Sequence, residues 1–268
     1  MSVFDAYIRK VSEYVEALRT DGQEAREFTC REAPDRIKET LPVRVGPKAH
    51  QGIILRSDTY LELGNPLAGS CAFVLWTQKP SLIHDGKITL LGPDIPESAE
   101  ESLPFAQVLI VGGEDLTDRD HESLVQHQYI SDRVEGYMIK SAPDRVWSRV
   151  SKVAAEKGFD FETLGKALLG VVKSEEPRVE AMEIVFVTAS KEAVQGLANL
   201  AAQIRKISKD IVKENWKIRG YDIECASDCS SCGEKVVCDD IRDVISVKKR
   251  KKKEDQGSGV RGQGSGSE

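Results

Sequence analysis

Four cysteines with the spacing of a metal site stand close together late in the chain, in the pattern C-x3-C-x2-C-x5-C: Cys225, Cys229, Cys232 and Cys238. Thiolate is a soft ligand that selects zinc, copper(I) and iron–sulfur clusters, and four thiolates supply one ligand per iron of a [4Fe–4S] cubane. A structural zinc site usually pairs two short knuckles across a loop of roughly 12–20 residues. Here all four lie in one short stretch, which favours a [4Fe–4S] cluster. Zinc, and free or disulfide-bonded thiols, are the alternatives.

The overall composition indicates a folded body with a solvated, acidic surface. The chain has 268 residues, of which 40% are hydrophobic and 31% are charged, with a net charge of −6. Residues 248–268 carry a net charge of +4, which leaves −10 on the rest of the chain. An acidic body argues against nucleic acid as the main partner.

Neither an export signal nor a membrane-spanning helix is expected from this sequence. The N-terminus has no basic segment followed by an apolar run, so no signal peptide is expected. No apolar stretch approaches the roughly 18 residues of a membrane-spanning helix, so a cytoplasmic protein is predicted. The cytosol keeps thiols reduced, which favours metal binding over disulfides in the cysteine cluster. Cys30 and Cys71 lie far from the cluster and are expected to be ordinary small, weakly polar residues.

The first half of the chain predicts one helix and several short strands. Apolar residues at helical spacing predict a helix over residues 3–19. Residues 21–50 are polar and predict a connecting loop with a helix fragment near 33–40. Turn signals then separate β-rich runs, which predict strands at 53–55, 59–63, 71–77, 88–91 and 108–111. The last run is almost wholly apolar, as in a strand covered on both faces.

The second half predicts mostly helices. Apolar positions at i, i+3 and i+4 predict helices over residues 121–140, 144–157 and 161–173. A strand over 182–187 follows, and then a long helix over 190–213 with Ser190 as its N-cap. This order predicts an α/β or α+β fold, a mixed sheet covered by helices.

The predicted domain organisation has four parts. Residues 1–50 form a helical N-terminal segment, 51–220 an α/β domain, 221–247 the four-cysteine segment and 248–268 a basic, Gly/Ser-rich tail. The tail cannot bury apolar area and is expected to be disordered and solvated.

Several separate motifs resemble the β subunit of the carbon monoxide dehydrogenase/acetyl-CoA synthase complex. The similarity covers roughly residues 58–240 and follows the order of the family, with motifs at 61–64, 88–94, 145–152, 161–167 and 182–188. It corresponds to the middle domain of the family running into the start of its metal-bearing domain, and it implies the fold of that middle domain.

The resemblance also implies a metal centre. The family's active site is a [4Fe–4S] cubane bridged through a cysteine to two nickels. Cys229, Cys232 and Cys238 match the opening of its cysteine pattern, with Cys225 as a replacement fourth ligand. No cysteine follows Cys238, so the Cys-Gly-Cys that holds the distal nickel is absent and nickel is not expected.

The resemblance further implies coenzyme A binding near a tryptophan and arginines. Trp147 occupies the matching segment, between Arg145 and Arg149. An indole face can stack on adenine, and guanidinium groups pair with phosphates. The alternative is that Trp147 only packs on a helix that it shares with Val146, Val150 and Val153.

These observations predict an iron–sulfur protein that serves as an electron-transfer or docking accessory of an anaerobic carbon monoxide dehydrogenase or corrinoid system. Ferredoxin, carbon monoxide dehydrogenase or corrinoid protein subunits are the expected partners. One alternative is a shortened acetyl-CoA synthase, an acyltransferase that takes its missing nickel ligands from another subunit. The other alternative is a zinc-stabilised adaptor.

Overall fold

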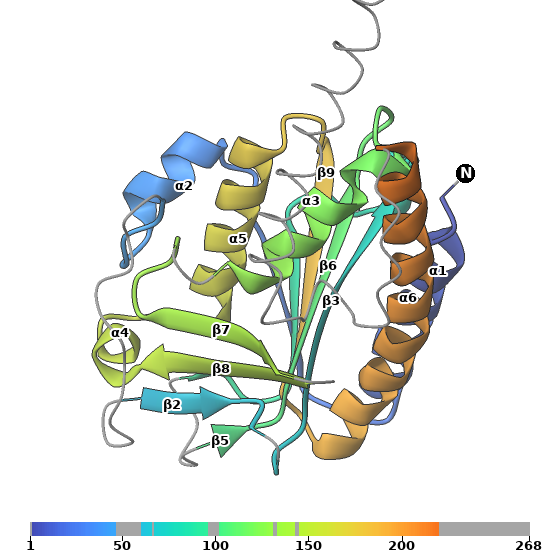
Figure 1. Ribbon diagram of the computed structural model, residues 1–268. Helices are drawn as coiled ribbons and strands as arrows, with labels where there is room; N and C mark the ends of the chain where they lie inside the picture. Colours follow the sequence, from blue (N-terminus) through green and yellow to red (C-terminus); the bar gives the residue numbers. More distant parts are fainter. Residues whose placement is uncertain are drawn as a thin grey trace, which may run out of the picture.

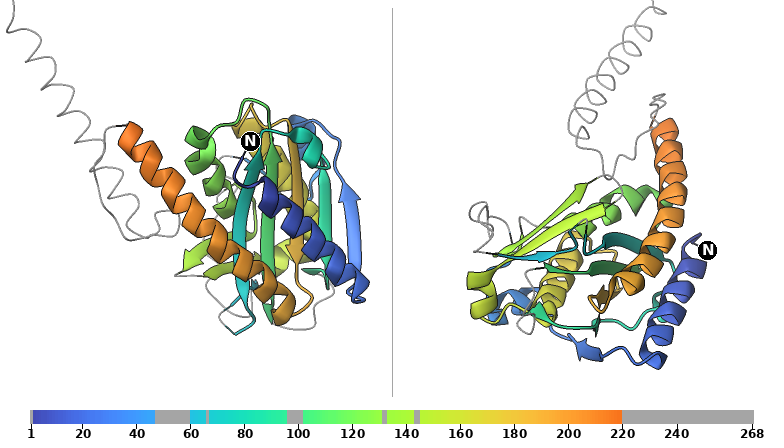
Figure 2. Two further views of the ribbon diagram at one scale, coloured as in Figure 1. Left: turned by 90° about the vertical axis from the view of Figure 1, so that its right-hand side faces the viewer. Right: turned by 90° about the horizontal axis from the view of Figure 1, so that it is seen from below.

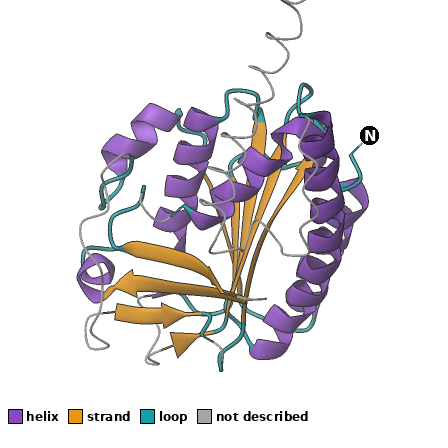
Figure 3. Ribbon diagram, viewed as in Figure 1, coloured by secondary structure: helices purple, strands orange, loops and turns teal. Residues whose placement is uncertain are grey.

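A five-stranded and a four-stranded sheet, packed with helices, form the body of the protein (Figures 1 and 3). The computed structural model describes residues 2–46, 60–65, 67–95, 102–130, 133–142 and 145–219. The predicted α/β or α+β class is confirmed, with both sheets mixed in strand direction. None of the helices described is long and apolar enough to cross a membrane.

The five-stranded sheet has the order β1-β4-β9-β6-β3. Its strands are β1 (Ala25–Thr29), β3 (Ser70–Thr77), β4 (Lys87–Leu91), β6 (Phe105–Gly112) and β9 (Ala181–Val187). Strand β6 pairs parallel to β3 and antiparallel to β9. All eight of its residues are buried, which confirms the predicted strand covered on both faces.

Helices cover both faces of this sheet. Helices α1 (Asp5–Thr20) and α6 (Lys191–Ile218) cross one face together (Figure 2), and the Tyr14 hydroxyl on α1 donates to the Ala193 carbonyl on α6 (2.9 Å). The opposite face carries α5 (Phe161–Glu175) and α2 (Pro34–Thr40), which pack against each other (Figure 1). The predicted Ser190 N-cap is confirmed, because its hydroxyl accepts from the Ala193 N–H (3.1 Å).

The four-stranded sheet has the order β5-β2-β8-β7. Its strands are β2 (Tyr60–Leu63), β5 (Ser102–Leu103), β7 (Tyr137–Ala142) and β8 (Arg145–Ser151), followed by the short helix α4 (Lys152–Glu156). It meets the larger sheet where the Val146 N–H of β8 donates to the Ser70 hydroxyl at the start of β3 (3.1 Å).

Two predicted helices were wrong. Residues 121–140 form the short helix α3 (His121–Gln126), a 3-10 turn (His127–Tyr129) and strand β7. Residues 144–157 form β8 and only one turn or so of helix in α4. Val146 and Val150 are four apart and so fit a helix stripe, but they also fit the two-residue period of a strand. Because valine is stiff at χ1 and packs well on a pleated sheet, the strand prevails.

Strand β1 lies where the sequence predicts a connecting loop, so this prediction is wrong. It pairs antiparallel with β4 at the edge of the five-stranded sheet, and none of its five residues is fully buried. A polar edge strand carries no hydrophobic period that could reveal it. The segment before residue 50 therefore contributes a strand besides α1 and α2, and its apolar residues join the common core. The strand predicted at 53–55 lies outside the described residues.

A buried histidine joins α1, β3 and α3. His121 is fully buried and stacks on Phe4, with 5.4 Å between ring centroids. Its Nδ1 accepts from the indole N–H of Trp76 (3.2 Å), and its Nε2 has no hydrogen-bond partner among the described residues. Burial lowers the pKa of His121 to about 4. His121 is therefore neutral at physiological pH.

The neutral histidine makes stability depend on pH. The unfolded chain takes up a proton on His121 near pH 6.5, whereas the folded chain does so only near pH 4, so stability is lost as the pH falls through this window. Replacing His121 by Gln keeps an acceptor for the Trp76 indole but removes the titration. We expect the fall in unfolding free energy between pH 7 and pH 5, measured by urea denaturation, to shrink by about 2 kcal/mol. An unchanged fall would contradict this assignment, and His84→Gln, at an exposed position, is the control.

Candidate functional site

The three residues predicted to contact coenzyme A lie on one side of strand β8. Arg145 is exposed, and Trp147 and Arg149 are half-buried, while the residues between them are buried. Alternate residues of a strand point to the same face, so Arg145, Trp147 and Arg149 share the outer face of the four-stranded sheet. The expected helix around Trp147 was wrong, and the strand aligns the three side chains more closely than a helix does.

Arg149 lies between two aromatic rings. Its guanidinium carbon is 3.9 Å from the ring centroid of Tyr60 and 3.9 Å from that of Trp147. The Trp147 indole N–H donates a hydrogen bond to the Glu62 carboxylate. Glu62 lies opposite Arg149 in the register of β2 and β8. Guanidinium over aromatic faces is a favourable cation–π arrangement. We call Tyr60, Glu62, Trp147 and Arg149 the arginine stack.

The sequence alone does not identify Tyr60 and Glu62 as neighbours of Trp147 and Arg149. Both come from β2, whose antiparallel register sets Tyr60 opposite Ser151 and Glu62 opposite Arg149. That register is a long-range feature with no signature in either strand alone. Only a strand prediction for residues 145–151 would have suggested that Trp147 and Arg149 have partners on a neighbouring strand.

Arg145 faces a groove at the other end of β8. The groove has a volume of about 450 Å³ and runs between α6 and the turn that precedes β3. Its lining residues come from three segments: Leu67, Gly69, Ser70, Arg145, Lys191, Val194, Gln195, Ala198, Asn199, Ala202 and Arg205. None of the described residues that line it is acidic, and three are cationic. We call it the α6 groove.

Cys71 lies behind this groove and offers no reactive thiol. Burial raises its pKa to about 12, and burial likewise raises the pKa of Cys30. Both cysteines are free and buried, as expected of small, weakly polar residues. A thiol with a raised pKa is protonated at neutral pH and is a poor nucleophile or metal ligand.

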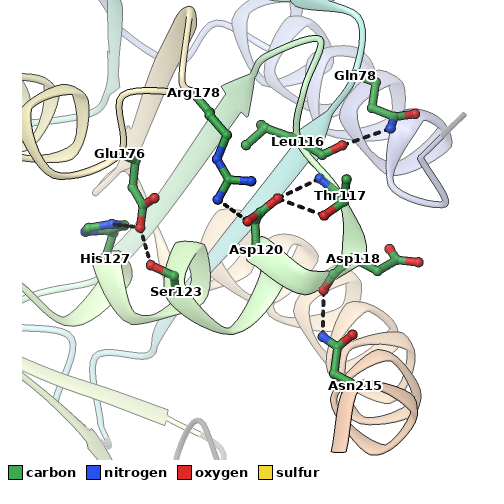
Figure 4. A network of polar contacts seen from close by, with 10 residues as sticks. All are labelled: Gln78, Leu116, Thr117, Asp118, Asp120, Ser123, His127, Glu176, Arg178 and Asn215. Atoms are coloured by element: carbon green, nitrogen blue, oxygen red, sulfur yellow. Dashed lines mark hydrogen bonds and ion pairs between the residues drawn. The ribbon is translucent and has the colours of Figure 1, made fainter. Parts of the chain in front are cut away.

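A network of polar contacts holds α3 to the rest of the body (Figure 4). Asp120 caps the turn before α3 by accepting from the backbone and hydroxyl of Thr117 (2.8 and 2.9 Å), and it pairs with Arg178. Glu176 accepts from Ser123 and contacts His127 Nε2 (3.2 Å). Ser123 and His127 thus meet at a carboxylate, which suits a structural clamp better than a serine–histidine catalytic pair.

The same network fixes the end of α6. The Asn215 amide donates to the Asp118 carbonyl (2.7 Å), and the Trp216 indole donates to Glu122 (2.9 Å). Arg219 pairs with Glu122 as well (3.0 Å). The C-terminal end of α6 is therefore held against α3 and the turn before it.

The predicted metal ligands are not among the residues that the structure describes. Cys225, Cys229, Cys232 and Cys238 all follow residue 219, so the cluster remains a prediction. Within the described ranges, no group of three or more His, Cys, Asp or Glu residues could hold a metal ion. His121 and His127 have separate partners, Trp76 and Glu176.

The arginine stack generates a prediction about stability. Replacing Arg149 by Ala removes two cation–π contacts and the apolar stem that packs between the rings. We expect the unfolding free energy to fall by about 1–2 kcal/mol in chemical denaturation. Lys152→Ala, an exposed change three residues further on, should alter it by less than about 0.5 kcal/mol. Equal effects of the two changes would show that the stack contributes no stability.

Comparison with known proteins gives one consistent result. The model of the CO dehydrogenase/acetyl-CoA synthase complex beta subunit family matches residues 41–194. Acetyl-CoA decarbonylase/synthase complex subunit beta 2 of Methanosarcina thermophila is 31% identical over 197 residues, which cover 72% of this chain and 40% of the relative. The corresponding subunit beta of Methanopyrus kandleri is 36% identical over 172 residues, covering 62% and 36%. That of Methanothermobacter thermautotrophicus is 29% identical over 198 residues, covering 72% and 41%.

The family match contains β8 and the arginine stack and ends within α6. The chain spans about 40% of the length of the curated relatives it matches. More than half of the chain lies within the matched region. The chain therefore belongs to the CO dehydrogenase/acetyl-CoA synthase complex beta subunit family.

Proposed function

We propose that this protein is a coenzyme A-binding, iron–sulfur accessory of an acetyl-CoA decarbonylase/synthase-type complex, where it docks partner subunits and passes electrons. The observation that carries the coenzyme A part is the outer face of β8, with Trp147 and Arg149 in the arginine stack and Arg145 at the α6 groove. The relatives are named as subunits of a complex, which supports docking to partner subunits. The partners that we propose are ferredoxin, carbon monoxide dehydrogenase or corrinoid protein subunits.

The chemistry of this face suits a nucleotide-bearing ligand. Because Arg149 lies over one face of the Trp147 ring, adenine would stack on the opposite face of the indole, and such stacking contributes roughly 1–3 kcal/mol. Planar guanidinium groups match phosphate geometry. Because two rings already hold the Arg149 guanidinium, less side-chain entropy is lost when a ligand binds.

The four-cysteine segment supports the iron–sulfur part of the proposal. Cys225, Cys229, Cys232 and Cys238 match the ligand number and softness that a [4Fe–4S] cluster requires and would hold it. When bound, such a cluster supplies one-electron transfer. The contacts of Trp216 and Arg219 with Glu122 hold the end of α6, six residues before Cys225 in the sequence.

Coenzyme A binding can be measured by titration calorimetry. We expect Trp147→Ala to weaken binding about 10- to 100-fold, because the stacking surface is lost. Arg149→Lys keeps the charge but loses the planar fork, and should weaken binding by a smaller factor. Lys152→Ala, which lies beyond the end of β8, serves as the matched control and should bind as the parent protein does. Full-affinity binding by Trp147→Ala, with its fold confirmed by circular dichroism, would remove β8 from the proposal.

The metal is tested by analysing protein purified without oxygen. The proposal expects about four iron and four sulfide per chain, with the iron lost in Cys229→Ser. Cys30→Ser, a change at a buried and free cysteine, should leave the iron content unchanged. About one zinc and no iron would instead support the zinc-stabilised adaptor. Stoichiometric nickel together with acetyl exchange would support the shortened synthase, and a metal-free protein would refute all three.

A further inference from the structure

A second groove, which we call the N-terminal groove, leaves apolar side chains partly exposed. It has a volume of about 490 Å³ and lies between the first residues of the chain, the turn before α3 and the second half of α6. Its apolar lining residues are Val3, Trp76, Ile207 and Ile211. Trp76 is buried, whereas Val3 is 50% exposed and the two isoleucines are only partly buried. Such a surface can bury further apolar side chains.

The rim of the N-terminal groove is acidic. Asp118 and Asp210 are both exposed, and none of the described residues that line the groove is cationic. Asp118 uses its backbone carbonyl to accept from Asn215 (2.7 Å), while its carboxylate points away from that contact (Figure 4). Neither carboxylate has an ion-pair partner within the described ranges. The groove therefore suits a segment that combines apolar and cationic side chains.

A segment of the same chain, outside the described residues, has this combination. Ile241, Val244 and Ile245 are spaced i, i+3 and i+4, a pattern that places three apolar side chains on one side of a helical segment. Six consecutive basic residues, 248–253, follow after two residues. Residues 241–253 thus match the groove both in their apolar side chains and in the sign of their charge.

The chain is long enough for this segment to reach the groove. Ile207 and Ile211 precede the end of α6 by eleven and seven positions, which is about 10–17 Å along the helix axis. The bond between Asn215 and Asp118 sets the end of α6 beside the rim. A flexible chain of the length from residue 219 to residue 241 spans roughly 25 Å on average, so it need not be extended. Because the segment is tethered, its effective concentration at the groove is on the order of mM, which favours it over a free basic peptide.

We propose that the N-terminal groove binds residues 241–253 of the same chain. Ile241, Val244 and Ile245 contact its apolar residues, and the basic run 248–253 pairs with Asp118 and Asp210. Docking of this kind holds the four-cysteine segment to the body at both of its ends. The inference depends neither on coenzyme A binding nor on which metal the cysteines hold.

Zero-length crosslinking of the full chain, purified without oxygen, tests the proposed docking. A carbodiimide joins lysine amines to carboxylates that already lie in contact with them. We expect mass spectrometry to find crosslinks from residues 248–253 to Asp118 and Asp210, at a yield about 10-fold above that to Glu13, an exposed acidic residue on α1. Crosslinks spread evenly over the exposed acidic residues, or none to Asp118 and Asp210, would overturn the inference.

Two matched variants of the segment separate specific docking from general attraction between opposite charges. Ile245→Asp removes an apolar contact and should lower the crosslink yield about 10-fold. Ser246→Asp adds the same charge one residue further on, off the apolar stripe, and should leave the yield unchanged. Val3→Lys, a change at an exposed position in the groove, repels the basic run and should lower the yield as well. Equal yields in Ile245→Asp and Ser246→Asp would contradict the proposed contact.

Isotope labelling identifies the chain that supplies the segment. Labelled and unlabelled protein are mixed before crosslinking. Crosslinked peptide pairs that are wholly labelled or wholly unlabelled support docking within one chain. Pairs that join a labelled peptide to an unlabelled one would show that a second copy occupies the groove, and the inference would be wrong.

Discussion

The antiparallel pairing of β8 with β2 and β7 is the constraint on which the site depends. It turns every second residue of Arg145–Ser151 inward, where Val146, Ser148 and Val150 are buried. The intervening residues must then share the outer face. A shift of this strand by one residue would exchange the two faces. The register that buries the valines is therefore the same register that places Trp147 and Arg149 on the outer face. The core thus fixes the geometry of the arginine stack.

The cross-strand partners add specificity to that geometry. Tyr60 and Glu62 on β2 hold the arginine and the indole by ring contact and hydrogen bond. At the other end of β8, the bond between Val146 N–H and Ser70 ties the strand to the larger sheet and thereby places Arg145 beside α6. The two sheets and α6 therefore meet beside Arg145.

The helical period of apolar residues predicted most of the helices. It failed where the same residues also fit the two-residue period of a strand. Helices α1, α5 and α6 carry long apolar stripes and were predicted, as was the fully apolar strand β6. Strand β8 was misassigned because Val146 and Val150 fit either a helix or a strand. Strand β1 had no buried position from which to infer it. For both β8 and β1, pairing with a strand that is distant in the sequence decides the structure. A short window of sequence does not contain that information.

The site was predictable only in part for the same reason. Arg145, Trp147 and Arg149 were identified through a resemblance, and they alternate along one short stretch of sequence. Tyr60 and Glu62 join Trp147 and Arg149 only through the fold, since they lie on β2. The cysteine cluster, in contrast, is informative through the spacing of its four residues alone. That Cys225 to Cys238 bind a metal remains a prediction.

The proposed coenzyme A binding depends most on the outer face of β8 and its partners on β2. Hydrogen–deuterium exchange in the presence and absence of coenzyme A tests this surface directly, because bound ligand slows local opening. We predict slower exchange in residues 145–151 and 60–63, with little change in β1 and α2. Slower exchange confined to other segments, or no change at saturating coenzyme A, would contradict it.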